Sequence, residues 1–349
     1  MTQRKYVYVV GAGASCEFGF PAGTQLTKEI SGYLRLGTDQ FGNVKSGDTR
    51  ILGAFDRIPP PEDGARRNRS YLSRVANDIA ENMGLALSID NYLEAKKKEE
   101  AAPELGKIGI ARALLRNERK SKLWFDEQKG QSPRPRFADF PENWLTNLFQ
   151  ILTRARGLDQ FLGALSSHYF VTFNYDRVIE QFFYCATKSY FSLDERQARD
   201  CITKHLNVVH VYGSLGDIMG PNVVSFGNED HSQYIFEASQ NIHTFSEGVR
   251  AGTEINRAKR WLQESNVISF LGFSFLPLNV RALKPERPLS EKRVFGTCHG
   301  LSADNLGIAK NILAKTWFRD DVPDMDFRPV YCAKLISDLS GFFGEDDLD

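Results

Sequence analysis

The sequence shows no excess of charge of either sign and contains no long hydrophobic run. Lys and Arg together number 44, as do Asp and Glu, so no net field draws the molecule toward nucleic acid or an anionic membrane. No stretch approaches the roughly 20 apolar residues that span a bilayer, and the first eight residues carry no apolar signal core. We therefore expect a cytoplasmic protein without direct nucleic-acid or membrane binding.

Metal-binding and disulfide motifs are also missing. The cysteines form no C-x-x-C pair, the histidines show no H-E-x-x-H spacing, and no carboxylate cluster has the spacing of a metal-dependent nuclease. No ATPase P-loop is present. These absences predict that the protein holds no metal, zinc module or disulfide framework. The cysteines are Cys16, Cys185, Cys201, Cys298 and Cys332.

Strand and helix patterns alternate along much of the chain. A β-rich run at 5–10 leads into a glycine turn and then a helical pattern at 24–36. The alternation resumes after residue 157 and predicts a doubly wound parallel α/β sheet, with ligands at the carboxyl ends of the strands. The later strands are expected at 168–173, 208–212, 267–272, 293–297 and 327–331, with helices at 177–187, 253–264 and 304–313.

The segment between these two parts has a different pattern. Residues 37–61 are rich in Gly, Asp and Pro and predict a long irregular connection beside the ligand cleft. Residues 63–156 are helical in pattern, with a loop at 128–136. We therefore predict an α/β domain formed by 1–62 and 157–349, interrupted by a helical insertion at 63–156. The helices of the insertion are expected at 71–83, 89–98, 105–119 and 144–156.

Polar and glycine residues follow several of the predicted strands and should converge at one edge of the sheet. Read together, the motifs resemble the sirtuin-like family of bacterial NAD-consuming proteins, many of which are antiphage defence effectors. The resemblance covers most of the chain and implies a Rossmann-like NAD-binding domain with a helical insertion in place of a zinc module. Its motifs are V-G-A-G-A-S (10–15), G-F-P (19–21), S-I-D-N-Y-L (88–93), V-T-F-N-Y-D-R-V-I-E (171–180), V-H-V-Y-G-S-L (209–215) and L-G-F-S-F (271–275).

Three polar residues are candidates for the chemistry of breaking the nicotinamide–ribose bond, which builds positive charge on the sugar. Asn174 can orient a ribose hydroxyl or a water molecule, and the resemblance points to the same residue; the alternative is a helix cap. Asp176 can bind a ribose hydroxyl or stabilise the cationic sugar, or it too caps a helix. The resemblance implies that Asp90 lies near the nicotinamide, although it can equally open a helix.

The general base is the point at which the sequence departs from the family pattern. Many relatives carry a histidine directly before the glycine that corresponds to Gly213, whereas this chain has Tyr212 there and a histidine at His210. Residues two apart on a strand face the same side, about 7 Å apart. His210 is thus a candidate base reaching the cleft from a deeper level, with Tyr212 lining the pocket; the alternative for His210 is a satisfied core histidine.

Cofactor contacts follow from the glycine turns and the family motifs. The first turn is expected to cradle the pyrophosphate of NAD through its backbone N–H groups. The turn at 272–274 can instead be a plain strand-to-turn transition. The residues expected at the pyrophosphate are Gly11, Ala12, Gly13, Ala14 and Ser15; Gly213, Ser214, Gly272 and Ser274 are expected near the adenosine ribose; and Pro21 and Thr172 are further binding candidates.

The leading functional hypothesis is an NAD glycohydrolase that yields nicotinamide and ADP-ribose and depletes NAD during phage infection. The resemblance implies a homo-oligomer, or a partnership with a HerA-type ATPase on a separate polypeptide. A second hypothesis, motivated by Tyr212, is a sensor or scaffold that binds NAD or ADP-ribose without turnover. Protein deacylation is a third, weakened by the expected lack of a zinc module.

Overall fold

The core of the protein is a six-stranded parallel sheet. The computed structural model describes residues 4–344 apart from 42, 61–67, 100, 126–134, 155, 220–223 and 320. Taken in chain order, the strands have the spatial order 3-2-1-4-5-6, which is the doubly wound Rossmann order and confirms the predicted fold class. The strands lie in the order β5 (Asn207–His210), β4 (His168–Thr172), β1 (Tyr6–Val10), β6 (Val267–Leu271), β7 (Arg293–Thr297) and β8 (Met325–Arg328).

Burial explains why these segments form central strands. Every residue of β1 and β6 is buried, as expected for parallel strands covered by helices on both faces. The strand β5 ends at His210, two residues earlier than predicted. The alternation argument that placed His210 and Tyr212 on one face of a strand was therefore wrong, because Tyr212 lies in the turn beyond the strand.

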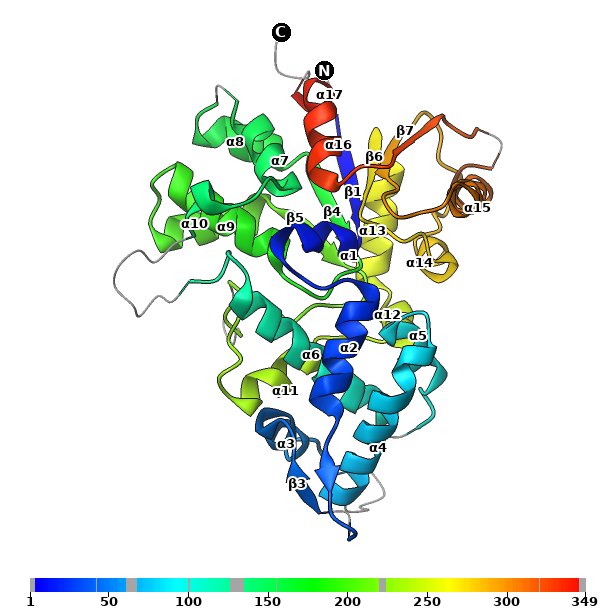
Figure 1. Ribbon diagram of the computed structural model, residues 1–349. Helices are drawn as coiled ribbons and strands as arrows, with labels where there is room; N and C mark the ends of the chain where they lie inside the picture. Colours follow the sequence, from blue (N-terminus) through cyan, green and yellow to red (C-terminus); the bar gives the residue numbers. More distant parts are fainter. Residues whose placement is uncertain are drawn as a thin grey trace.

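Helices cover the sheet on both sides (Figure 1). The helix α7 packs against α16, α8 and α9, so this part of the predicted insertion belongs to the layer around the sheet. These helices are α7 (Trp144–Thr153), α8 (Leu158–Leu165), α9 (Val178–Tyr190), α10 (Glu195–His205), α13 (Thr253–Glu264), α14 (Pro277–Ala282), α15 (Ala303–Leu313), which continues as a π-helix (Ala314–Phe318), α16 (Cys332–Asp338) and α17 (Ser340–Gly344).

A second, mainly helical lobe lies at the carboxyl ends of the strands (Figure 1). The lobe includes elements that precede and follow residues 63–156 in the chain. The helix α11 packs against α6 and α3, and α2 packs against α6 and α4. The boundaries 63–156 stay a prediction. The lobe contains α2 (Gly23–Leu34), β2 (Gly37–Thr38), β3 (Val44–Ser46), α3 (Thr49–Phe55), α4 (Arg69–Asn82), α5 (Ile89–Ala95), α6 (Ala102–Lys120), α11 (Ser232–Gln240) and α12 (Phe245–Ala251). Short 3-10 helices lie at Met83–Leu85 in this lobe, at Cys16–Phe18 after α1 (Ala12–Ser15), and at Phe137–Asp139.

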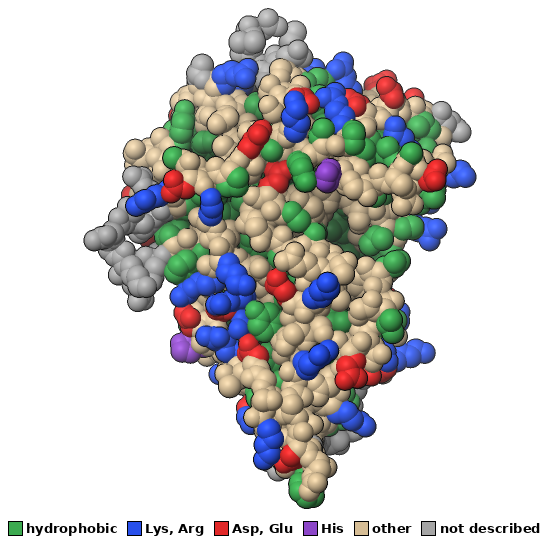
Figure 2. All heavy atoms as spheres, in the orientation of Figure 1, with side chains coloured by type: hydrophobic (Ala, Val, Ile, Leu, Met, Phe, Trp, Pro, Cys, Tyr) green, Lys and Arg blue, Asp and Glu red, His purple; other side chains and the backbone are tan. Residues whose placement is uncertain are grey.

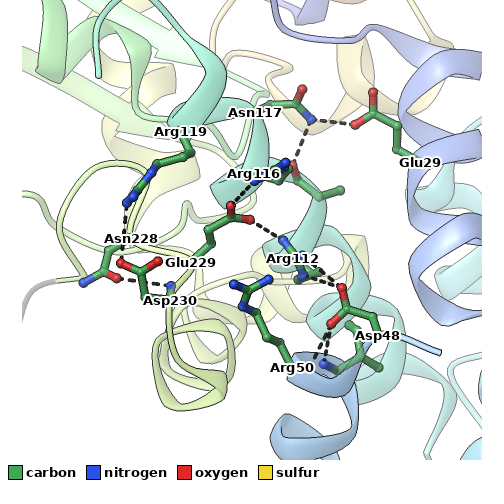
Figure 3. Close-up of polar contacts among 12 residues, drawn as sticks. Glu29, Asp48, Arg50, Arg112, Arg116, Asn117, Arg119, Asn228, Glu229 and Asp230 are labelled. Carbon is green, nitrogen blue, oxygen red and sulfur yellow. Dashed lines mark hydrogen bonds and ion pairs between the residues drawn. The ribbon is translucent and has the colours of Figure 1, made fainter. Parts of the chain in front are cut away.

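A network of charged side chains connects α3, α6 and the segment before α11 within the lobe (Figure 3). Asp48 caps α3 by accepting from the Arg50 and Ile51 amides, and it also pairs with the buried Arg112 of α6. Arg112 and Arg116 both bind Glu229, which precedes α11. The expectation of an irregular connection at 37–61 was therefore wrong in part, since this segment forms a hairpin and α3. The expected loop at 128–136 lies mostly outside the described residues.

Candidate functional site

A cavity of about 530 Å³ lies at the carboxyl ends of the strands, between the sheet and the helical lobe. Its walls come from the segments after β1, β4, β6, β7 and β8, and from α2, α5, α6 and α14. The strand order reverses between β1 and β6, at the middle of this row, which is where doubly wound sheets bind ligands. On the face shown in Figure 2, side chains of both charge signs are interspersed.

The glycine turn after β1 packs directly against the turn after β6. A Cβ atom on Gly13 would lie 2.8 Å from Cα of Gly272, and one on Gly272, whose φ is +56°, would lie 2.1 Å from N of Ala14. Three amides of this turn already have partners: Gly11 donates to Leu271 O, Gly13 to Gly272 O and Ala14 to Gly11 O. At most two of the five amides expected to cradle a pyrophosphate, those of Ala12 and Ser15, therefore remain.

Asn174 follows β4, lines the cavity and is 9% exposed. Its Nδ2 donates to the carbonyl oxygen of Gly11 at 3.1 Å and to Oγ of Ser15 at 2.9 Å. Because a carbonyl oxygen only accepts, this network fixes which end of the amide is nitrogen. Both amide protons are used, so Asn174 has only its Oδ1 acceptor left to offer a ligand.

Asp176 shares this network and also lines the cavity. The Ser15 hydroxyl donates to its carboxyl group, and the Val178 amide donates to Oδ1 at 3.3 Å. Burial raises the pKa of Asp176 to about 6, against opposing effects of the two hydrogen bonds and of the His210 charge. Ser15 thus accepts from Asn174 and donates to Asp176, which links the two candidates.

Asp90 reaches the same cavity from the opposite lobe, in the first turn of α5. The Tyr175 hydroxyl donates to its Oδ1. Burial raises the pKa of Asp90, although the bond from Tyr175 opposes this shift. Ser88, and not Asp90, caps the helix by accepting from the Asn91 amide. The structure therefore brings Asn174, Asp176 and Asp90 to one cavity.

His210 lies behind this wall and is not among the residues that line the cavity. Its Nδ1 is 2.8 Å from the carbonyl oxygen of Asn174, and its Nε2 is 2.7 Å from Oε1 of Glu180. Both ring nitrogens are occupied by acceptors, which leaves neither of them free to take a proton from a ligand. These contacts argue against His210 as the general base and place its ring against the backbone of Asn174.

The other predicted residues divide between the cavity and its surroundings. Pro21, Gly272 and Ser274 line the cavity. Thr172 supports Asn174, because its Oγ1 accepts from the Asn174 amide at 3.0 Å. Tyr212 is buried and donates to Oδ1 of Asn279, a cavity residue, at 3.0 Å.

Gly213 and Ser214 lie in the segment that follows β5. Gly213 forms an isolated bridge with Ile242, and Ser214 Oγ accepts from the Gly216 amide at 3.1 Å. Neither is among the cavity-lining residues, and their contact with an adenosine ribose stays a prediction.

The sequence did not predict the end of the cavity that is formed by the segments after β7 and β8. His299 and Tyr331 line it there, with ring centroids 4.2 Å apart, and Tyr331 is 62% exposed. Cys16, Cys298 and Cys332 lie along the same cavity. The position of His299, two residues after a predicted strand, was a usable signal. Tyr331 gave none, because it was expected to lie inside a strand that ends at Arg328.

The described part of the chain offers neither a cluster of metal ligands nor a membrane-spanning helix. Within those residues, no group of three or more His, Cys, Asp or Glu side chains could hold a metal ion. Likewise, no helix among them is long and apolar enough to cross a membrane.

No protein-family model matches the chain, and no curated protein is significantly similar to it. Solved structures of Sir2 homologues do align with it. One, a complex with NAD, has 13% identity and a TM-score of 0.39 over 98% of this chain and 91% of that chain. A mutant with 2'-O-acetyl ADP-ribose has 14% identity and a TM-score of 0.40 over 99% and 96%. Similarity this low does not establish a shared activity.

Proposed function

We propose that the cavity binds NAD and that the protein cleaves its nicotinamide–ribose bond. The observation that carries this proposal is the position of the cavity across the point where the strand order reverses, with different chemistry at its two ends. Four strand spacings of about 4.8 Å separate β4 from β8, so the row is about 19 Å wide. An elongated dinucleotide fits such a row with its diphosphate at the glycine turn.

The polar end suits the nicotinamide ribose. Asn174 Oδ1 can accept a hydrogen bond from a ribose hydroxyl or from the attacking water. The carboxylates of Asp176 and Asp90 can stabilise the positive charge that develops on the sugar. With a pKa of about 6, Asp176 is ionised at neutral pH and can also take the proton of the water molecule.

The experiment that tests this function measures nicotinamide release from NAD by the purified protein, alone and with the product of a neighbouring gene. We expect release by the wild-type protein and a loss of about 10²-fold in Asn174→Ala, because the attacking group is then poorly oriented. Unchanged release in Asn174→Ala would contradict the assignment of the site.

The resemblance of the motifs extends the proposal to biology. V-G-A-G-A-S, V-T-F-N-Y-D and the other motifs resemble those of bacterial antiphage effectors. We therefore propose that the protein depletes NAD in the cytoplasm during phage infection, as a homo-oligomer or together with a HerA-type ATPase.

A sensor without turnover is the second candidate, and the occupied ring of His210 favours it. A sensor binds NAD or ADP-ribose and releases no nicotinamide. Calorimetric binding of NAD combined with no release under either condition would support the sensor and overturn the hydrolase.

The aromatic end provides a separate prediction for binding. If His299 and Tyr331 hold the adenine ring, Tyr331→Ala should weaken the binding of ADP-ribose by about 5- to 160-fold, since stacking a base contributes about 1–3 kcal/mol. Calorimetry measures this change. Tyr190 is also exposed but lies on α9, so Tyr190→Ala should bind ADP-ribose as tightly as the wild type. Equal affinities of the Tyr331 variant and the wild type would place the base elsewhere.

A further inference from the structure

A pair of half-buried charged residues lies directly behind Asn174. His210 ends β5, and Glu180 lies in the first turn of α9. Their side chains are 12% and 20% exposed, and His210 Nε2 lies 2.7 Å from Glu180 Oε1. The carboxylate is further favoured there because the N-terminus of a helix stabilises negative charge. Neither residue is among those that line the cavity.

The protonation state of the ring follows from its partners. The carbonyl oxygen of Asn174 can only accept, so Nδ1 must carry a proton. An ionised Glu180 can also only accept, so Nε2 must carry one as well. The ring is then a cation that faces a carboxylate on one side and the Asn174 backbone on the other. The second oxygen of Glu180, Oε2, is buried without a hydrogen-bond partner, so the His210 contact is the main support of this carboxylate.

The shifts in pKa agree with this geometry. Burial would lower the pKa of His210, yet the charge and hydrogen bond of Glu180 and the bond to the Asn174 carbonyl raise it overall. Burial would raise the pKa of Glu180, but the charge of His210 lowers it. Each partner thus keeps the other ionised.

The surrounding charges leave this pair intact. Arg177, in the turn between β4 and α9, is neutralised by Glu118 from α6. Asp176, in the same turn, accepts from Ser15 and interacts with the His210 charge. Besides His210, Arg177 acts on the charge of Glu180 and Glu118 acts on that of Asp176.

We propose that His210 and Glu180 form a charged positioning pair for the cleavage reaction. The imidazolium ring holds the carbonyl of Asn174 from behind and thereby fixes the Asn174 side chain at the cavity wall. Asn174 precedes and Glu180 follows the turn from β4 into α9. The His210 ring contacts both residues and so connects both ends of this turn to β5. This inference rests on the proposed function, since it concerns how Asn174 meets NAD.

Glu180→Gln separates the charge from the contacts. A glutamine amide can donate to Nε2 of a neutral ring that keeps its proton on Nδ1, so both hydrogen bonds survive and the ion pair does not. We expect kcat for nicotinamide release to fall about 10- to 100-fold, as when a partner behind a functional residue is lost, with little change in KM. His205→Gln, at a histidine bonded to Ser166 away from the cavity, should keep wild-type kcat.

A second measurement does not depend on turnover. Nitrogen NMR of ¹⁵N-histidine-labelled protein at pH 7.5 should show His210 doubly protonated in the wild type and neutral in Glu180→Gln, with the signal assigned by its loss in His210→Gln. A neutral ring in the wild type overturns the pair, as does wild-type kcat in Glu180→Gln. No nicotinamide release by the wild type overturns the proposed function and with it the catalytic role of the pair, while the NMR signal still shows whether the ion pair exists.

Discussion

An Asp176→Asn variant should release nicotinamide about 10²- to 10⁴-fold more slowly than the wild-type protein, and yet unfold at a higher denaturant concentration at pH 7.5. The loss of activity follows from the loss of the carboxylate that faces the cavity. Asparagine keeps an acceptor oxygen for the Val178 amide. It cannot take a proton or balance the positive charge of the sugar.

The gain in stability follows from the buried charge. Asp176 has an ordinary pKa of 3.8 that burial raises to about 6 in the folded protein, so folding disfavours its ionised form. The resulting cost is absent below the unfolded pKa, grows as pH rises from 3.8, and is complete above about pH 6. The difference between the two values corresponds to about 3 kcal/mol, which asparagine would recover at neutral pH.

Urea unfolding at pH 7.5 and pH 4, together with nicotinamide release between pH 5 and 8, checks both parts. The stability difference should shrink toward pH 4, and wild-type activity should fall as the pH drops below about 6. Asp200→Asn, at an exposed aspartate on α10, should change neither quantity. A less stable Asp176→Asn protein would show that the carboxylate is stabilised where it lies.

The sequence was sufficient for the architecture because central parallel strands are long apolar runs. The runs at 5–10 and 267–272 became β1 and β6 almost unchanged, and every residue of both strands is buried. The rule that ligands bind at strand ends then placed Asn174 and Asp176 correctly at the cavity. Asp90 was located through the family resemblance and reaches the cavity from the helical lobe.

What sequence could not supply were partners that are distant in the chain. His210 was a candidate base until Glu180 and the Asn174 carbonyl were found on its two nitrogens. The glycines of the first turn suggested a phosphate cradle. In the structure, however, Gly13 packs against Gly272, which is far away in the chain. Both facts depend on which strands lie side by side, and local patterns do not encode this.

The charged residues near the turn from β4 into α9 differ in whether they line the cavity. Those that do not line it form ion pairs, whereas Asp176 lines it. The ion pairs Glu180–His210 and Glu118–Arg177 flank the turn from β4 into α9 on two sides. Within that turn, Asp176 faces the cavity without such a cation in direct contact. This arrangement leaves a net negative charge at the cavity, where the proposed reaction develops positive charge.

The Glu118–Arg177 pair leads to the largest expected loss of stability. Glu118 is fully buried in α6 and Arg177 is 1% exposed at the start of α9. The guanidinium binds both carboxylate oxygens, at 3.0 Å and 2.6 Å, and the Gly227 amide donates to the same carboxylate at 2.8 Å. Glu118→Gln leaves a buried cation without its counter-charge and presents amide hydrogens to donors. We expect the free energy of unfolding to fall by about 3–5 kcal/mol.

Urea unfolding measures this loss, and Glu195→Gln supplies the control. Glu195 pairs with Arg199 on α10, where both side chains are solvent-exposed, so its loss should cost less than about 1 kcal/mol. Arg177→Met combined with Glu118→Gln should cost clearly less than the sum of the two single changes, because the uncompensated charge is then gone. Additive costs would show that the pair is not coupled. Because Arg177 directly follows Asp176, Glu118→Gln should also slow nicotinamide release, and this readout connects the anchoring of α9 to the site.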